Sequence, residues 1–392
     1  MRYSNILEFI LFSIFLIGCR NMENNMGNRL APCLYVDIDK AEQFVSDEDS
    51  RLIDSCECEL LQLECTTGIG SIVDLKFNKD RMILLDNNRQ RLHIINKAGV
   101  CEHEISCLGR AANEYIEITD FFATDESVYI LDMASLKVIE YDYNGTYMGK
   151  TQINEYWANK LFVVDENIFL INEGSDTKHG KRHIFEMQKD GGVVNSYIPF
   201  EVSPGLSCEY AYGLHSKDTI LYAERESNTI YKISRSTCEP FLTLDFGNYN
   251  LPEKFKTMDA RDLMFNTNQE YQKYALGIEK IFVSQKYIFV KFQAKNNNYL
   301  LVIDHKRKSI VFCGRGIRIE RMFQLGLRDY YIHDNFIYDV YDKEDFISVV
   351  DYKMKESKNN VNDYMKQLHS LMAERESENW NPIIIKYKIK NE

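Results

Sequence analysis

The sequence predicts an all-β protein built from copies of one four-stranded unit, and three observations support this prediction. The stretch 106–150 contains four short runs rich in Ile, Val, Tyr and Phe, as strands are, separated by turn-like breaks. The segment before it repeats the pattern, since ILLD at 83–86 matches YILD at 129–132. Three turn glycines recur at intervals of 46 residues: Gly99, Gly145 and Gly191. A period of about 40–50 residues that carries four strands is typical of a β-propeller blade.

Six such units account for the chain. They begin with blades at about 71–107 and 116–153, and continue with NKLFVVDEN to VVNSYIPF, EYAYGLHSKD to FLTLDF, IEKIFVSQK to SIVFCGRG, and LRDYYIHDN onward. The sixth unit has three strands, in LRDYYIHDN, FIYDVYDKEDFISVVD and NPIIIKYKIK. We therefore expect the unpaired strand CELLQLE at 58–64 to supply the fourth and close the ring without an exposed sheet edge.

Two helical insertions interrupt this pattern, at about 252–277 and 355–377, where apolar residues recur at helical spacing among charges. We expect an ordinary insertion that packs on the ring, in preference to a functional lid. The fold prediction is thus a six-bladed β-propeller with N- and C-terminal strand closure and two helical insertions.

The N-terminus predicts export. Arg2 precedes a short apolar run at 6–17, and the run ends in Leu-Ile-Gly-Cys19, which resembles the lipobox of bacterial lipoproteins. We expect a lipoprotein signal peptide at 1–18, lipidation at Cys19, a tether at 19–55 and the propeller at 56–392. A plain secretory signal or an N-terminal anchor helix is the alternative. Acyl chains would tether the protein without spanning the bilayer.

Composition and motifs exclude several function classes. The net charge of −12 disfavours nucleic acid as a partner. The sequence shows no zinc-spaced Cys/His pattern, HExxH, P-loop or GxSxG, so we expect no cofactor, no metal and no assigned catalytic residue. Nine cysteines follow Cys19. Most are expected to be small buried apolar residues, and their oxidation state is open.

The run LGRAANEYIEITDF…VYILDMASLKVIEYDYNG resembles the blade of NHL-type propellers. More closely, it resembles the six-bladed β-propeller lipoproteins of Gram-negative gut anaerobes, which carry a glycine-rich turn, an acidic-aromatic "DF", an "IYILD" strand and a "YDxxG" turn. Asn381-Pro382 before an apolar strand also matches that family. The resemblance implies the fold and export, and it implies no particular chemistry. This chain departs from the family at 109–115, where the flexible glycines of the turn are lost.

Ligands of propellers usually bind at the face where the b–c connection of each blade and the connection to the next blade converge. Candidate ligand-binding residues on that face are Asp86, Asn87, Arg89, Arg110, Asn113, Glu114, Asp132, Arg225, Arg315, Arg318 and Arg321. A repeated Asp after an apolar strand, as at Asp86 and Asp132, is more often structural than catalytic, because it accepts N–H groups of the following turn.

The segment GRGIRIER at 314–321 places three arginines within seven residues of an acidic chain. Arginine suits bidentate binding of carboxylate, sulfate or phosphate. The alternative is ion pairing with acidic residues of neighbouring blades.

The functional prediction is a binding module of the cell envelope, lipid-anchored to the outer membrane, with a glycan, a peptide or an envelope protein bound at the channel mouth. A monomer is expected, and the sequence leaves open which membrane face it occupies. Two alternatives remain: a propeller lyase or hydrolase acting on a polysaccharide or peptide, and a structural partner of an outer-membrane complex.

Overall fold

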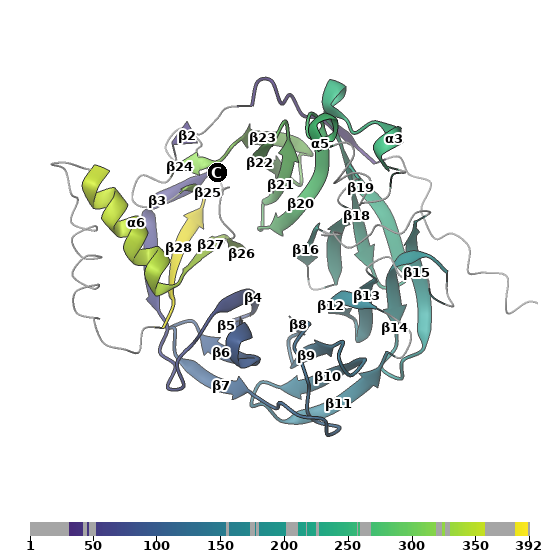
Figure 1. Cartoon of the computed structure of the whole chain (residues 1–392), viewed down its shortest axis with the longest axis vertical. Helices are drawn as coiled ribbons and strands as arrows, with labels where there is room; N and C mark the ends of the chain where they lie inside the picture. The colour runs from purple at the N-terminus through teal and green to yellow at the C-terminus, as the bar shows by residue number, and fades with distance from the viewer. Residues whose placement is uncertain are drawn as a thin grey trace, which may run out of the picture.

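Six antiparallel sheets stand around a common axis in the computed structural model (Figure 1). The structure describes residues 31–41, 45–46, 52–153, 157–172, 177, 180–200, 211–216, 218–224, 227–256, 258, 268–318, 324–325, 330–356 and 381–390. The six-bladed propeller predicted from the sequence is confirmed.

Each blade has four strands from the axis outward, and in blades one to five these follow chain order. Blade one contains β4 (Ile72–Asn78), β5 (Arg81–Asp86), β6 (Arg91–Asn96) and β7 (Cys101–Ile105). Blade two contains β8 (Asp120–Ala123), β9 (Ser127–Asp132), β10 (Lys137–Asp142) and β11 (Tyr147–Gln152). Blade three contains β12 (Ala158–Val164), β13 (Asn167–Asn172), β14 (Arg182–Met187) and β15 (Val193–Pro199). Blade four contains β16 (Ala211–Ser216), β17 (Thr219–Ala223), β18 (Thr229–Ser234) and β19 (Thr237–Asp245), and blade five contains β20 (Ala275–Val283), β21 (Tyr287–Ala294), β22 (Asn297–Asp304) and β23 (Ser309–Gly314).

Blade six joins the two ends of the chain. Its strand order is β26 (Tyr331–His333), β27 (Phe336–Tyr341), β28 (Ile383–Ile389) and β3 (Ile53–Gln62). Strand β3 pairs antiparallel with β28, with Leu61 opposite Ile384. The predicted closure is therefore confirmed, and the closing strand begins five residues earlier than the sequence pattern indicated.

The hydrophobic core consists of layers between neighbouring blades. One cluster joins blades one and two, for example Ile83 to Phe121 and Ile130, and a matching cluster occupies each of the other five interfaces. The middle strands are covered on both faces, so β9, with sequence SVYILD, is buried along its whole length. This explains why the sequences of these strands are continuous apolar runs and not alternations of apolar and polar residues.

The N-terminal segment is more ordered than a plain tether. Strand β1 (Cys33–Tyr35) pairs in parallel with β19, on the outer edge of blade four. Strand β2 (Val45–Ser46) pairs in parallel with β24 (Ile317–Arg318), which also pairs with β25 (Gln324–Leu325). Parts of the range expected to be a tether therefore add strands to the ring.

The first insertion packs on the ring. Helices α3 (Glu253–Lys256) and α5 (Asn268–Tyr271) follow the 3-10 turn η3 (Gly247–Tyr249). Phe255 of α3 is buried with Leu251 and Leu276, and Tyr271 and Tyr274 pack against them.

The second helix corrects the sequence interpretation. Helix α6 (Lys343–Glu356) begins in the stretch read as strand FIYDVYDKEDFISVVD, and the expected helix at 355–377 lies mostly outside the described residues. Asp342 caps α6, since its carboxylate accepts the Asp345 N–H at 2.8 Å. Phe346 and Val350 then face the core between blades five and six. Capping and helical spacing outweighed the β-branched residues of FISVV.

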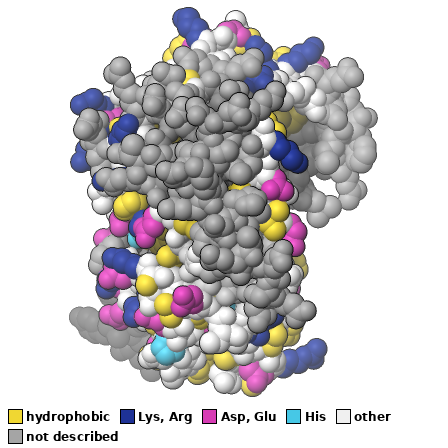
Figure 2. All heavy atoms as spheres, turned by 90° about the vertical axis from the view of Figure 1, so that its left-hand side faces the viewer, with side chains coloured by type: hydrophobic (Ala, Val, Ile, Leu, Met, Phe, Trp, Pro, Cys, Tyr) yellow, Lys and Arg dark blue, Asp and Glu magenta, His cyan; other side chains and the backbone are white. Residues whose placement is uncertain are grey.

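The side of the ring that carries blade six and α6 has a mixed surface. Figure 2 shows lysine, arginine and acidic side chains interspersed over its described atoms. A charged ligand therefore finds no large patch of one sign on the described part of this side. Among the described residues, no helix combines the length and the apolarity needed to cross a membrane.

Candidate functional site

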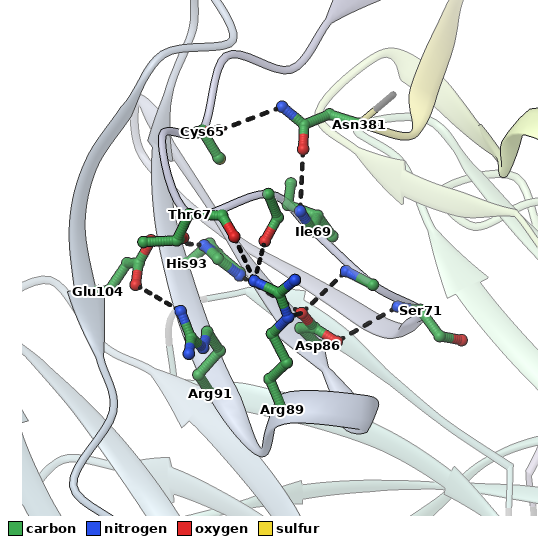
Figure 3. Close-up of polar contacts among 12 residues, drawn as sticks. Cys65, Thr67, Ile69, Ser71, Asp86, Arg89, Arg91, His93, Glu104 and Asn381 are labelled. Carbon is green, nitrogen blue, oxygen red and sulfur yellow. Dashed lines mark hydrogen bonds and ion pairs between the residues drawn. The ribbon is translucent and has the colours of Figure 1, made fainter. Parts of the chain in front are cut away.

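The b–c turns and the connections between blades lie together on one face, which we call the mouth face. Arg89, in the turn η1 (Asn87–Arg89) of blade one, donates to the backbone carbonyls of Thr67 and Gly68 in the connection from blade six (Figure 3). The Tyr115 hydroxyl, in the connection to blade two, donates to the Gln90 carbonyl at 2.8 Å. One turn of blade one thus contacts the connections on both sides of it.

Asp86 and Asp132 are structural on this face. Asp86 is fully buried and accepts the N–H groups of Gly70 and Ser71 at 2.9 and 3.2 Å (Figure 3). Asp132 repeats the arrangement one blade later, accepting the Ile116 N–H at 2.9 Å and also the hydroxyl of Ser135. Each carboxylate fixes the start of its blade, so neither is available to a ligand.

The turn at 109–115, which lacks the glycines of the resembling family, is held by side chains. The Glu114 carboxylate accepts the Ala111 N–H at 2.8 Å. The Lys137 ammonium donates to the Glu114 carbonyl at 2.6 Å. The Asn113 carbonyl accepts the Tyr141 hydroxyl at 2.7 Å, while the Asn113 side chain is exposed. The Glu114 carboxylate is thus already hydrogen-bonded within the turn.

Arg110 and Arg315 differ from the other candidates. Arg110 is exposed at the tip of the 109–115 turn, and Arg315 is half-buried just after β23. Within the described part of the chain, neither forms an ion pair or a hydrogen bond with its side chain. The alternative that the arginine segment pairs with neighbouring blades therefore finds no support at Arg315.

The other predicted site residues lie partly or wholly outside the described structure. The side chains of Asn87 and Arg318 are outside it, although Arg318 lies in β24 with its backbone paired to Gln324. Arg225, Arg321 and Cys19 lie entirely outside the described residues.

A buried polar cluster at the outer part of blade one was not predicted. His93 of β6 is fully buried, and its Nδ1 lies 3.4 Å from Glu104 Oε1 and 3.8 Å from Cys101 Sγ. Glu104 also pairs with Arg91 at 3.0 Å and accepts the Thr67 hydroxyl (Figure 3). A hydrogen bond from the Cys65 thiol lowers the pKa of Cys101.

These residues escaped the sequence analysis because Cys65, His93 and Cys101 come from separate strands and connections. The signal that could have found them is strand register. His93 lies opposite Glu104 in the β6–β7 pair, and Glu64 forms a parallel bridge with Val100, so that Cys65 lies beside Cys101.

A second unpredicted feature joins the innermost strands of three blades. Asp120 of β8 is buried, and its carboxylate lies 2.6 Å from Lys76 Nζ of β4 and 3.6 Å from Lys160 Nζ of β12. It also accepts the Leu161 N–H at 2.8 Å. Asp120 begins the "DF" of the family resemblance, so the motif had a structural basis that the sequence did not show.

Comparisons with known proteins support the propeller fold but indicate no activity. The chain is similar to the crystal structure of a candidate exported protein from Bacteroides fragilis, with 16% identity, a TM-score of 0.65, and coverage of 92% of this chain and 100% of that one. It is also similar to a member of the duf4221 family from Bacteroides vulgatus, with 10% identity, a TM-score of 0.53, and coverage of 87% and 98%. No curated protein matches the sequence.

The family comparison is more specific. A family model described as "Domain of unknown function (DUF4934)" matches residues 37–388, which includes every blade. The relationship to NHL-type propellers suggested by the sequence is not confirmed. The chain belongs to the DUF4934 family.

Proposed function

We propose that this protein is an exported binding module that holds an anionic group of a glycan, a peptide or an envelope protein on its mouth face. The observation that carries the proposal is that two cations, Arg110 between blades one and two and Arg315 after blade five, have no side-chain partner in the described structure of a protein of net charge −12. Guanidinium groups bind carboxylate, sulfate or phosphate through paired hydrogen bonds.

The neighbouring polar side chains on the mouth face support this assignment, because they already form hydrogen bonds within the protein. Asp86, Asp132, Arg89 and Glu114 are used in bonds that hold the loops. A rigid set of loops costs little ordering entropy when a ligand binds. Arg110 and Arg315 are therefore the described groups on this face that are best placed to meet a ligand.

The test is a binding screen with the protein that follows the signal peptide. Acidic oligosaccharides, their neutral counterparts and acidic peptides are compared by calorimetry. A charge-assisted contact contributes about 1.5–3 kcal/mol, so the double variant Arg110→Ala/Arg315→Ala, which removes whichever arginine the ligand contacts, is expected to bind an acidic ligand at least about tenfold more weakly.

The matched control is Arg307→Ala. Arg307 lies in the turn between β22 and β23, on the opposite face, with 80% of its side chain exposed. The Arg307→Ala substitution removes one positive charge, against two in the double variant, and is expected to leave affinity unchanged within about twofold. Equal loss in the control, or binding of neutral ligands alone, contradicts the proposal.

We further propose that the protein is lipid-anchored to the outer membrane through Cys19. The lipobox residues Leu16 to Cys19 support this, and so does the similarity to a candidate exported protein. Cys19→Ala is expected to abolish acylation of the N-terminus, because alanine has no sulfur to carry an acyl-glycerol group. Mass spectrometry of the mature wild-type N-terminus should show an acylated cysteine. An unmodified N-terminus at another residue would contradict the anchor.

A further inference from the structure

Two cysteines and a histidine converge where the closing strand enters blade one. Cys65 lies in the connection from β3 to β4, His93 on β6, and Cys101 at the start of β7. One ligand atom from each lies within 4.8 Å of the others. Backbone pairing fixes the arrangement, because the Cys101 N–H donates to the Glu64 carbonyl at 3.0 Å and so aligns Cys65 with Cys101.

Glu104 lies beside the imidazole, but it is not part of the three-residue group, and its Oε1 accepts the Thr67 hydroxyl. Glu104 faces His93 across the β6–β7 pair, with Oε1 3.4 Å from Nδ1. The Cys101 sulfur is 3.8 Å from the same nitrogen. Zinc bonds of about 2.0–2.3 Å in a tetrahedron place neighbouring ligand atoms roughly 3.3–3.8 Å apart. The Cys101–His93 separation lies at the upper end of that spacing, and the three ligand atoms would have to move closer together by at most about 1 Å around the ion.

The surroundings of His93 fit a bound cation. Nε2, the other ring nitrogen, is buried without a hydrogen-bond partner in the described structure, and Asp86 Oδ2 lies 3.8 Å from it. Metal-bound histidines usually direct their second nitrogen at a carboxylate, which fixes the tautomer. Asp86 is itself held by two backbone N–H groups, and Arg91 holds the far oxygen of Glu104.

We propose that Cys65, His93 and Cys101 bind a zinc ion, with water as the fourth ligand, and that the ion fastens the closing connection to the outer strands of blade one. The cation replaces the proton of each thiol, and the two protons pass to solvent. Because Cys65 follows the closing strand directly, the metal links both ends of the chain to blade one. The site is independent of the arginines on the mouth face.

A disulfide between Cys65 and Cys101 is the competing chemistry for the same pair. It would use the two sulfurs and leave the buried imidazole of His93 without a metal or a hydrogen-bond partner at Nε2. A zinc ion uses both sulfurs and the imidazole, and it accounts for the position of Asp86 Oδ2 at 3.8 Å from Nε2.

The test measures metal and thiols in the protein that follows the signal peptide, purified without a metal-affinity step. One equivalent of zinc is expected by plasma mass spectrometry in the wild type and in the control Cys313→Ser, a half-buried cysteine outside the cluster. Cys65→Ser and Cys101→Ser are expected to retain less than a tenth of it.

Measurements on the wild-type protein remain decisive where a variant fails to fold. After chelation, added Zn²⁺ should protect Cys65 and Cys101 from alkylation but leave Cys313 reactive, and Co²⁺ should give the absorption of a tetrahedral thiolate site. A Cys65–Cys101 disulfide in the purified protein, or thiols that alkylate equally with and without Zn²⁺, overturns the proposal.

Discussion

Replacing Asp120 with alanine is expected to lower the free energy of unfolding by about 3–5 kcal/mol, the usual cost of removing one partner of a buried ion pair. The Asp120 side chain is 1% exposed, and Lys76, with 15% exposure, would lose the nearer of its two counter-charges at 2.6 Å and keep only Asp74 at 3.4 Å. The Leu161 N–H would lose its acceptor as well. The loss acts on three blades at once, and chemical denaturation measures it.

A nearby exposed pair supplies the control. Lys79 and Asp125, in the first turns of the same two blades, lie 3.2 Å apart with 59% and 34% of their side chains exposed. Exposed pairs contribute about 0–1 kcal/mol, so Asp125→Ala should change stability little. An Asp120→Ala variant no less stable than Asp125→Ala would show that the three-blade contact is unimportant.

Acid should remove the same stabilisation. Burial raises the pKa of Asp120, but the Lys160 and Lys76 ammonium groups and the hydrogen bonds from Lys76 and the Leu161 N–H outweigh burial, so the pKa lies below 3.8. A carboxyl whose pKa falls on folding stabilises the protein above its unfolded pKa, and this contribution is lost as the pH falls through the folded pKa. The stability difference between wild type and Asp120→Asn should therefore narrow below about pH 4.

The fold could be predicted because the propeller repeats itself. A period in the chain, with one unpaired strand at its start and one incomplete blade at its end, determines the number of blades and the closure. Helix α6 could not be read in the same way, because FISVV favours a strand until the Asp342 cap is recognised. Strands β1 and β2 contain three and two residues. They pair through backbone groups, so they leave no periodic pattern in the sequence.

The mouth face could be predicted, but the roles of its residues could not. Blade topology places Asp86 and Arg110 on that face, yet only the structure shows that Asp86 accepts two backbone N–H groups while the Arg110 side chain has no partner among the described residues. It is harder still to predict from the sequence which distant residues come together in space. His93 and Cys65 are 28 positions apart, and their approach depends on strand register between the closing connection and blade one.

The periodic glycines have a physical reason beyond turn formation. Gly99, Gly145 and Gly191 all have positive φ, at 87°, 81° and 88°. Each also abuts a backbone carbonyl of the outermost strand of the preceding blade, namely Gln62, Glu104 and Gln152. A Cβ would be 3.2 Å from that carbonyl at Gly145, 2.8 Å at Gly191, and closer than Cβ atoms normally approach at Gly99. The repeat therefore marks the contact between successive blades.

Gly99→Ala is accordingly expected to be the most damaging of the three substitutions, at about 2–5 kcal/mol: about 1–2 for positive φ and about 1–3 for forcing the backbone of β3 away. Gly191→Ala should cost less and Gly145→Ala least. The control is Gly180→Ala, which has φ of 84° but no described atom within 4 Å of the new Cβ, so it carries the φ cost alone. Denaturation midpoints rank the four variants. If Gly99→Ala matches Gly180→Ala, close approach to the closing strand is not what selects glycine, and the 46-residue period reflects turn conformation only.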